Sequence, residues 1–308
     1  EFGVFHEDPM FKETSIRFAV RALLAAAASP ALIALPVAQA QTEPPTASAV
    51  PASQTVNVTA QTGAYSEEKD SASAVAPTQA SLLATQPQSI ITRDFIERAV
   101  TPAAEYSAII NIAPSLSGTA RNGPGLSETK TTLRGFGDDQ YNITFDGIPW
   151  GDTNNPAHHS TSFFPASVIG GVLIERGPGN ASNIGFATFG GSVNLYSKKL
   201  GERAETSLFG SVGTWNTRVM GFSHETGSSA SLAGGKAWVN VQEIRSDGYL
   251  SYNSIKSDNY TAKFENQVGS DSVLTLFSSI NRIHYVQPDN SNGATLAQIA
   301  LYGKSYSL

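Results

Sequence analysis

The sequence Leu133-Arg134-Gly135-Phe136-Gly137 opens the segment, residues 133–199, that decides the fold of the chain. The segment continues with Ile143-Thr144-Phe145-Asp146-Gly147-Ile148-Pro149, then Val172-Leu173-Ile174-Glu175-Arg176-Gly177-Pro178, and finally Gly190-Gly191-Ser192-Val193-Asn194-Leu195-Tyr196. Each piece is a short β-branched or apolar run closed by Gly, Pro or Asp-Gly, which predicts strands joined by tight turns. Arg134, Glu175 and Arg176 interrupt the apolar strand ends. Each must face water or an opposite charge, because burying a charge alone costs several kcal/mol.

The residues upstream of this segment predict a mixed α+β region. Residues 89–91 form an apolar run typical of a short strand, and Thr92 is placed to cap a following helix. We expect a second helix to begin at Thr101 and to end at Pro114. The Gly- and Pro-containing residues 115–129 are expected to form a loop.

The pattern changes after Lys199, where apolar and polar residues alternate along the chain. The alternation predicts strands at residues 206–212, 237–242, 260–265 and 273–280. Transmembrane barrel strands carry such faces, and so do the strands of a soluble antiparallel sandwich. The strands alone therefore leave both architectures open.

The four pieces of residues 133–199, in this order, resemble the plug domain of TonB-dependent outer-membrane receptors. The resemblance extends over residues 54–285 and implies an α+β plug domain at residues 81–199. Residues 200–308 are then the first antiparallel strands of a transmembrane β-barrel. Fewer than about eight strands do not close a membrane barrel, so we expect the chain to be a truncated part of a longer receptor.

The N-terminal region has the features of an export signal. We interpret residues 1–9, which are acidic and precede Met10, as a non-native or upstream extension. Residues 10–40 contain a basic start, an Ala- and Leu-rich run and Ala38-Gln39-Ala40, which together predict a signal peptide. The alternative, an amphipathic or buried N-terminal helix, is disfavoured by Pro30 and Pro36, which would break it. The protein is therefore expected in the outer membrane of a Gram-negative cell.

Residues 41–80 are rich in Ala, Thr, Ser, Pro and Gln, which predicts a periplasmic linker. One alternating strip within it resembles a TonB box, and the alternative is a chance match in a low-complexity segment. An alternating strip can add to a partner's sheet as an edge strand. The resemblance implies the C-terminal domain of TonB, with its inner-membrane energising complex, as that partner. The strip consists of Gln54, Thr55, Val56, Asn57, Val58, Thr59 and Ala60.

The resemblance also implies a latch between the plug and the barrel wall. Arg134 and Arg176, with Glu175 beside them, occupy family positions whose guanidinium groups pair with barrel-wall carboxylates. Guanidinium forks suit a reversible contact because bidentate pairs hold geometry and can be exchanged. The alternative is that each arginine pairs within the plug, Arg176 with its neighbouring strand.

A polar and aromatic loop follows Trp150. Its side chains are candidates for contact with an extracellular solute, because apical plug loops face the ligand in this family; a solvated or periplasmic loop is the alternative. The adjacent histidines do not predict a metal site, since neighbouring side chains point apart and no further ligands occur at a recognised spacing. The candidate residues are Asp152, Asn154, Asn155, His158, His159, Phe163 and Phe164.

Composition excludes several classes of function. The chain has 20 Lys and Arg against 26 Asp and Glu, so it has no excess of positive charge for nucleic acid. It contains no cysteine, which rules out thiolate metal sites and a cysteine nucleophile. Hydrolase and metalloprotease motifs are missing from the sequence, so we expect no enzyme and no cofactor.

The resemblance implies active, TonB-dependent transport of a scarce solute, with the plug closing the barrel lumen. Ferric siderophores or similar metal chelates are the expected cargo, because they are the most frequent cargo of this family. No residue of the sequence identifies the solute. The alternative is an energy-independent porin or adhesin. The mixed region from residue 89 to residue 195 argues against it, because porins have no long N-terminal globular domain.

Overall fold

A computed structural model describes residues 86–151, 164–177, 188–286 and 293–307, together with residues 78, 84 and 185. All of them belong to one compact unit, Asn57–Leu308. The signal peptide predicted at residues 10–40 and the strip at residues 54–60 lie outside the described residues.

The first part of the unit is built on a five-stranded sheet in the order β1-β6-β7-β4-β5. The β4 and β7 strands are parallel, and the other neighbours are antiparallel. Asp146 and Gly147 join β4 to β5 with φ angles of 49° and 82°, as a two-residue hairpin turn requires. The strands are β1 (Gln88–Thr92), β4 (Asn142–Phe145), β5 (Ile148–Trp150), β6 (Ile169–Glu175) and β7 (Ser192–Ser197).

Two short helices, α2 (Arg93–Ala99) and α3 (Tyr106–Ile110), and a hairpin of β2 (Leu116–Ala120) and β3 (Thr129–Leu133) accompany this sheet. The Thr92 hydroxyl caps α2 by accepting a hydrogen bond from the Phe95 amide at 3.2 Å. The apolar faces of helix and sheet form one buried cluster that includes Ile109, Val172 and Leu195. This is the α+β domain of the chain.

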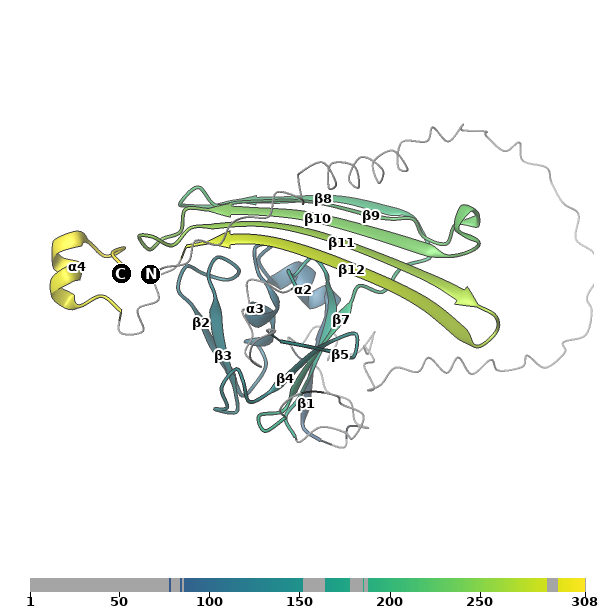
Figure 1. Cartoon of the computed structure of the whole chain (residues 1–308), viewed down its shortest axis with the longest axis horizontal. Helices are drawn as coiled ribbons and strands as arrows, with labels where there is room; N and C mark the ends of the chain where they lie inside the picture. The colour runs from purple at the N-terminus through teal and green to yellow at the C-terminus, as the bar shows by residue number, and fades with distance from the viewer. Residues whose placement is uncertain are drawn as a thin grey trace, which may run out of the picture. The chain divides into compact units, whose positions relative to one another are not determined.

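The second part is an antiparallel sheet in the order β12-β11-β10-β9-β8. Figure 1 shows its strands side by side as one long, curved sheet. The bounds are β8 (Glu205–Val212), β9 (Arg218–Glu225), β10 (Lys236–Ser246), β11 (Ile255–Val268) and β12 (Ser272–Tyr285), followed by helix α4 (Leu296–Tyr302). No helix within the described ranges is long and apolar enough to cross a membrane.

The curved sheet has two different faces. On β10, Trp238, Asn240 and Gln242 are buried against the α+β domain, whereas Val241 between them is exposed. The exposed face continues across the sheet with Leu208 on β8, of which 81% is exposed. The face that contacts the α+β domain is the inner face, and the opposite one is the outer face.

Several sequence predictions about these elements are confirmed, and others are wrong; the second helix, for example, ends at Ile110 and not at Pro114. Strands occur at each of the four alternating runs after residue 199. The second helix begins at Tyr106 instead of Thr101, because the Glu105 carboxylate caps it by accepting from the Ser107 amide at 2.7 Å. The expected loop at residues 115–129 contains strand β2, which pairs with β3.

Candidate functional site

The inner face of the curved sheet binds the α+β domain through polar side chains. The Gln242 amide donates to the Pro102 carbonyl at 3.2 Å and accepts from the Ser167 hydroxyl at 2.6 Å. The Asn240 amide donates to the same hydroxyl at 3.2 Å. Hydrogen bonds of this kind are individually weak on balance, about 1 kcal/mol each. They can therefore be broken one at a time without unfolding either part.

One large aromatic side chain joins the sheet to the core of the α+β domain. Trp238 on β10 is 1% exposed and belongs to the same buried cluster as Val168 and Leu195. Its indole N–H donates to the Ser223 hydroxyl on β9 at 2.8 Å. Phe277 on β12 packs at the edge of this cluster, with its ring centroid 4.9 Å from that of Phe145.

One side chain of the β2–β3 turn, Asn122, holds the loop between β10 and β11 of the curved sheet. The Asn122 amide donates to the Asn253 carbonyl at 2.8 Å. Its side-chain oxygen accepts from the amides of Tyr249 and Leu250 at 3.1 and 3.0 Å. Asn122 thus satisfies three backbone groups of residues 247–254, the loop between β10 and β11.

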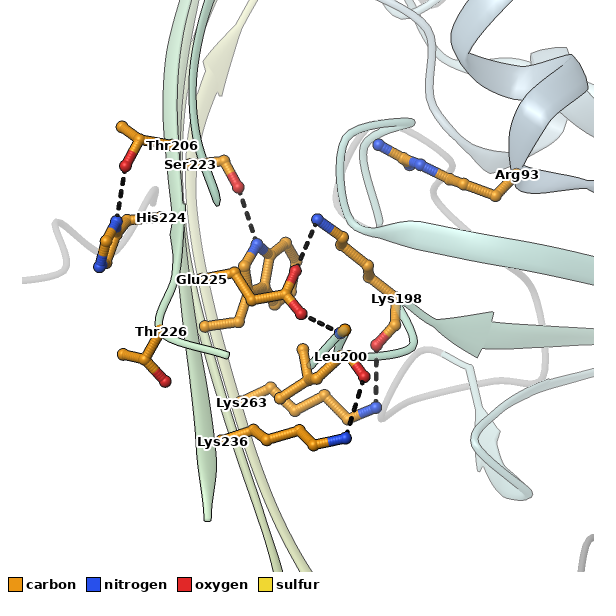
Figure 2. Close-up of polar contacts among 12 residues, drawn as sticks. Arg93, Lys198, Leu200, Thr206, Ser223, His224, Glu225, Thr226, Lys236 and Lys263 are labelled. Atoms are coloured by element: carbon orange, nitrogen blue, oxygen red, sulfur yellow. Dashed lines mark hydrogen bonds and ion pairs between the residues drawn. The ribbon is translucent and has the colours of Figure 1, made fainter. Parts of the chain in front are cut away.

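The segment that leaves β7 is fixed to the inner face by a buried glutamate. Glu225, the last residue of β9, is only 3% exposed. Its carboxylate pairs with Lys198 Nζ at 2.9 Å and also accepts a hydrogen bond from the Gly201 amide. Figure 2 shows these contacts converging on Glu225. We call the contacts that fix residues 198–202 to the inner face the linker clamp.

Two further lysines complete the linker clamp from neighbouring strands. Lys263 on β11 donates to the Lys198 carbonyl at 3.0 Å. Lys236 on β10 donates to the Leu200 carbonyl at 3.5 Å and pairs with Glu202. Figure 2 shows both ammonium groups reaching the same short segment. Three consecutive strands therefore hold the exit of the α+β domain.

All three predicted latch residues make hydrogen bonds within the α+β domain. Arg176 donates to the Ser89 hydroxyl at 2.6 Å and to the Gln88 carbonyl at 3.0 Å, both on its neighbouring strand β1. Glu175 is buried and accepts from Gln86 at 2.6 Å and from Ser192 at 3.1 Å. Burial within this network keeps the Glu175 carboxylate from reaching a surrounding wall.

Arg134 differs from these two because its side chain is exposed. Its guanidinium donates to the Arg176 carbonyl at 2.9 Å. Its backbone is left-handed, with φ of 57°, next to Gly135 at 81°, a conformation that costs a non-glycine residue about 1 kcal/mol. Within the described part of the chain, no carboxylate lies within ion-pair distance of Arg134 or Arg176.

Glu105 is a buried carboxyl at the contact between the two parts. Burial raises its pKa to about 7, although hydrogen bonds from the Ser107 side chain and backbone oppose that rise. It lines a small cavity shared with Gln242 and Asn259 of the curved sheet. Because the folded pKa exceeds the unfolded value of 4.5, this group favours folding fully below that pH. The contribution is lost as the pH rises through about 7.

Most of the candidate solute loop, Asp152, Asn154, Asn155, His158, His159 and Phe163, lies outside the described residues. Phe164 is described, and it corrects the prediction. It is buried and stacks on Phe145 with ring centroids 3.8 Å apart, so it belongs to the core. Across the described ranges, no group of three or more His, Asp or Glu could hold a metal ion.

Sequence reasoning missed Glu225, Trp238 and Asn122 as contact residues. Glu225 and Trp238 stand at inner-face positions of alternating strands, which is the only signal that could have found them. Asn122 lies in a turn with no periodicity. Their partners lie far away in the sequence, so only the fold reveals these contacts.

Comparison with known proteins gives one family and a set of similar structures. Residues 82–192 match the family model described as the TonB-dependent receptor plug domain. A comparison with curated proteins gave no match.

Three solved structures illustrate the likeness in fold. Ferric citrate transporter FecA, in the unliganded form, has a TM-score of 0.56 at 16% identity, over 72% of this chain and 34% of that chain. The pyoverdine receptor FpvA from Pseudomonas aeruginosa PAO1, bound to pyoverdine, has a TM-score of 0.54 at 16% identity, over 64% and 27%. The alcaligin outer-membrane receptor FauA from Bordetella pertussis has a TM-score of 0.51 at 22% identity, over 66% and 32%.

These matches confirm the predicted fold class, an α+β plug domain followed by antiparallel strands of a receptor barrel. This chain spans about a quarter to a third of the length of those three structures.

Proposed function

Because residues 82–192 match the plug-domain model of TonB-dependent receptors, we propose that the chain is part of such a receptor and serves active transport of a scarce solute across the outer membrane. In this proposal the α+β domain is the plug, and strands β8–β12 are part of the wall of a barrel of about 22 strands. The plug closes the lumen until a solute binds at the extracellular face.

One observation carries the proposal: the two faces of the curved sheet are built for different surroundings. The inner face is polar and hydrogen-bonded to the plug through Asn240 and Gln242. The outer face has an apolar cross-strand row of Leu208, Phe222, Val241, Tyr260 and Ile280. A barrel wall needs an apolar face toward lipid and a polar face toward the lumen. A soluble sandwich would bury the apolar face instead.

The energy for opening comes from the inner membrane in this proposal. The strip at residues 54–60 adds as a strand to the C-terminal domain of TonB, and main-chain hydrogen bonds supply the affinity. Proton-motive force, transmitted through TonB, then pulls on the plug from its N-terminal side. The outer membrane has no energised gradient of its own, so this protein needs neither ATP nor a cofactor.

We propose that Arg134, with Arg176, forms the latch to the wall. The exposed guanidinium and left-handed backbone of Arg134 support this role, since strained conformations persist where a function requires them. The hydrogen bonds of Arg176 to β1 also fit the alternative of a contact within the plug. An acidic wall residue outside the described strands would be the partner.

The solute class follows from the relatives. The three similar structures are a ferric citrate transporter, a pyoverdine receptor and an alcaligin receptor. We propose that this protein carries a ferric siderophore or a similar metal chelate. Asp152, Asn154, Asn155, His158, His159 and Phe163 stay the candidate contacts.

Removing residues 54–60 is expected to reduce energised uptake to the level of de-energised cells, while solute binding persists. In this proposal TonB pulls on the plug through the strip at residues 54–60, whereas the solute binds at the extracellular face. Uptake and surface binding of radioactive iron would be measured with ferric citrate, ferripyoverdine and ferric alcaligin, with and without an uncoupler.

A matched pair of single substitutions controls for the deletion. Val58→Pro removes a main-chain donor from the strip, whereas Val75→Pro makes the same change in the linker outside it. We expect only Val58→Pro to stop uptake. Uptake that survives both the deletion and the uncoupler would identify an energy-independent channel and contradict the proposal.

A further inference from the structure

The outer face carries a row of basic side chains near one end of strands β9–β12. Registry places Arg218 opposite Arg245, Arg245 opposite Lys256, and Lys256 opposite His284. Alternation along each strand puts all four side chains on the face directed away from the plug. We call these four residues the basic row.

Like charges directly opposite one another on neighbouring strands destabilise a sheet. Arg245 is neutralised by Asp258 at 2.7 Å and by Glu243 at 3.4 Å. Among the residues that the structure describes, no acidic group lies within ion-pair distance of Arg218 or Lys256. The basic row therefore lacks internal compensation for its two exposed cations.

The next cross-strand row adds one cation and two acids. It contains Met220, Glu243, Asp258 and Arg282 in direct register. With Asp247, which lies beside Arg245 at the end of β10, the cations Arg218, Arg245, Lys256 and Arg282 exceed the acids Glu243, Asp247 and Asp258 by one charge at neutral pH. The patch as a whole thus attracts an anion.

The position of the patch identifies the kind of anion. It adjoins the apolar row defined above, with the exposed Met220 between them. On its other side lie the exposed aromatic residues Trp215 and Tyr249, whose ring centroids are 5.1 Å apart. Aromatic side chains of this kind gather where a membrane meets water. The basic row therefore lies at the level of lipid headgroups, above the acyl chains.

A cavity of about 610 Å³ opens at this place. Its lining includes the cations Arg218, Arg245 and Lys256, the acids Glu243 and Asp247, and the apolar side chain of Met220. Cations exceed acids by one in this recess and Met220 adds an apolar side, so an occupant with both a negative group and hydrocarbon complements it.

We propose that the basic row binds the phosphate groups of an anionic, phosphorylated lipid in the leaflet at that level. The inference rests on the proposed function, because it requires the outer face to lie in a membrane. A phosphorylated lipid supplies the missing negative charge and also covers Met220 and the apolar row. A free phosphate ion supplies only the charge.

The test is lipid binding by the protein in nanodiscs of uncharged phosphatidylcholine. The probes are bisphosphorylated lipid A, the same lipid after dephosphorylation, and inorganic phosphate. Native mass spectrometry or fluorescence titration reports the bound lipid. We expect lipid A to bind at least about tenfold more tightly than its dephosphorylated form, since each Arg or Lys contributes about fivefold at a membrane surface.

The discriminating variant is Arg218→Gln with Lys256→Gln, which removes the two cations that have no ion pair in the described strands. We expect its affinity for lipid A to fall by about 30-fold. The control, Arg98→Gln with Lys130→Gln, removes two exposed cations from the plug and should bind lipid A like the unmodified protein. Both changes alter net charge equally, so they separate the basic row from bulk electrostatics.

Three results would overturn the inference: equal affinity for the two forms of lipid A, unchanged binding by the double variant, or full competition by inorganic phosphate at equal concentration. The proposed function fails separately, either by energy-independent uptake or by failure of the unmodified protein to enter nanodiscs.

Discussion

Replacing Trp238 by alanine is expected to lower the amide-exchange protection of plug strands β6 and β7 by more than about 100-fold. Trp238 is 1% exposed and packs in the core cluster of the plug, although it belongs to strand β10. Truncating a buried tryptophan costs about 3–5 kcal/mol. It also leaves the Ser223 hydroxyl without its indole donor. This loss of stability should appear in the plug, because the cavity left by the missing indole opens at the surface of the plug.

Hydrogen exchange of the membrane-bound protein measures this effect strand by strand. Trp238→Phe retains most of the packing and should cost about 1 kcal/mol, the hydrogen-bond contribution. Trp215→Ala is the control, because its side chain is 52% exposed and lies outside the buried clusters. Loss of protection confined to β10, with β6 and β7 unchanged, would show that Trp238 does not join the wall to the plug core.

Replacing Glu225 by alanine is expected to release the segment of residues 198–202 from the inner face. Breaking a buried ion pair costs about 3–5 kcal/mol. Lys198 is 22% exposed and can turn toward water, so we expect about 2 kcal/mol. That free energy corresponds to an increase of about 30-fold in the open population of the linker clamp.

Limited trypsin digestion reports this opening, because Lys198 and Lys199 are trypsin sites within the released segment. Cleavage should accelerate by about 30-fold, provided that closing is faster than cleavage. Glu205→Ala removes a glutamate of β8 that faces Glu225 across the strands but is exposed, and it should leave the cleavage rate unchanged. Equal cleavage of Glu225→Ala and the unmodified protein would contradict the role of the clamp.

The linker clamp bears on how the plug would open. TonB would pull at the N-terminal side, whereas Glu225, Lys236 and Lys263 hold the C-terminal exit of the plug. Force would then act between these two ends. The uncharged hydrogen bonds of Asn240 and Gln242 would break before the clamp does, so movement would begin on the N-terminal side.

Local sequence signals predicted the elements whose causes are local. Asp146-Gly147 gave the β4–β5 hairpin because a short turn requires two left-handed residues. Thr92 gave the start of α2 through its own hydroxyl. The alternating runs predicted β8, β10, β11 and β12, since successive residues of a strand point to opposite faces of the sheet.

The sequence patterns did not predict elements that depend on tertiary contacts. Strand β9 carries Gly221, where an added side chain would meet the Phe209 ring at 2.0 Å. The glycine obscures the alternation, although the fold requires it there. Helix α3 begins later than its Thr-Pro signal suggests because the buried Glu105 caps it. The contacts of Glu225, Trp238 and Asn122 join distant parts of the sequence, so alternation could place Glu225 and Trp238 on one face of the sheet but could not identify their partners.

The most direct measurement determines which face of the curved sheet meets lipid. The sequence has no cysteine, so single cysteines at Leu208, Phe222 and Ile280 on the outer face can carry spin labels. A label at Ser279 on the inner face is the comparison. Collision with membrane-soluble oxygen and with a water-soluble nickel chelate is then measured in isolated outer membranes.

We predict that the three outer labels collide with oxygen and are shielded from the nickel chelate. The label at Ser279 should collide with the nickel chelate more readily than with oxygen. Outer labels that collide freely with the nickel chelate, or that are shielded from both reagents by protein, would contradict a membrane wall around a plug.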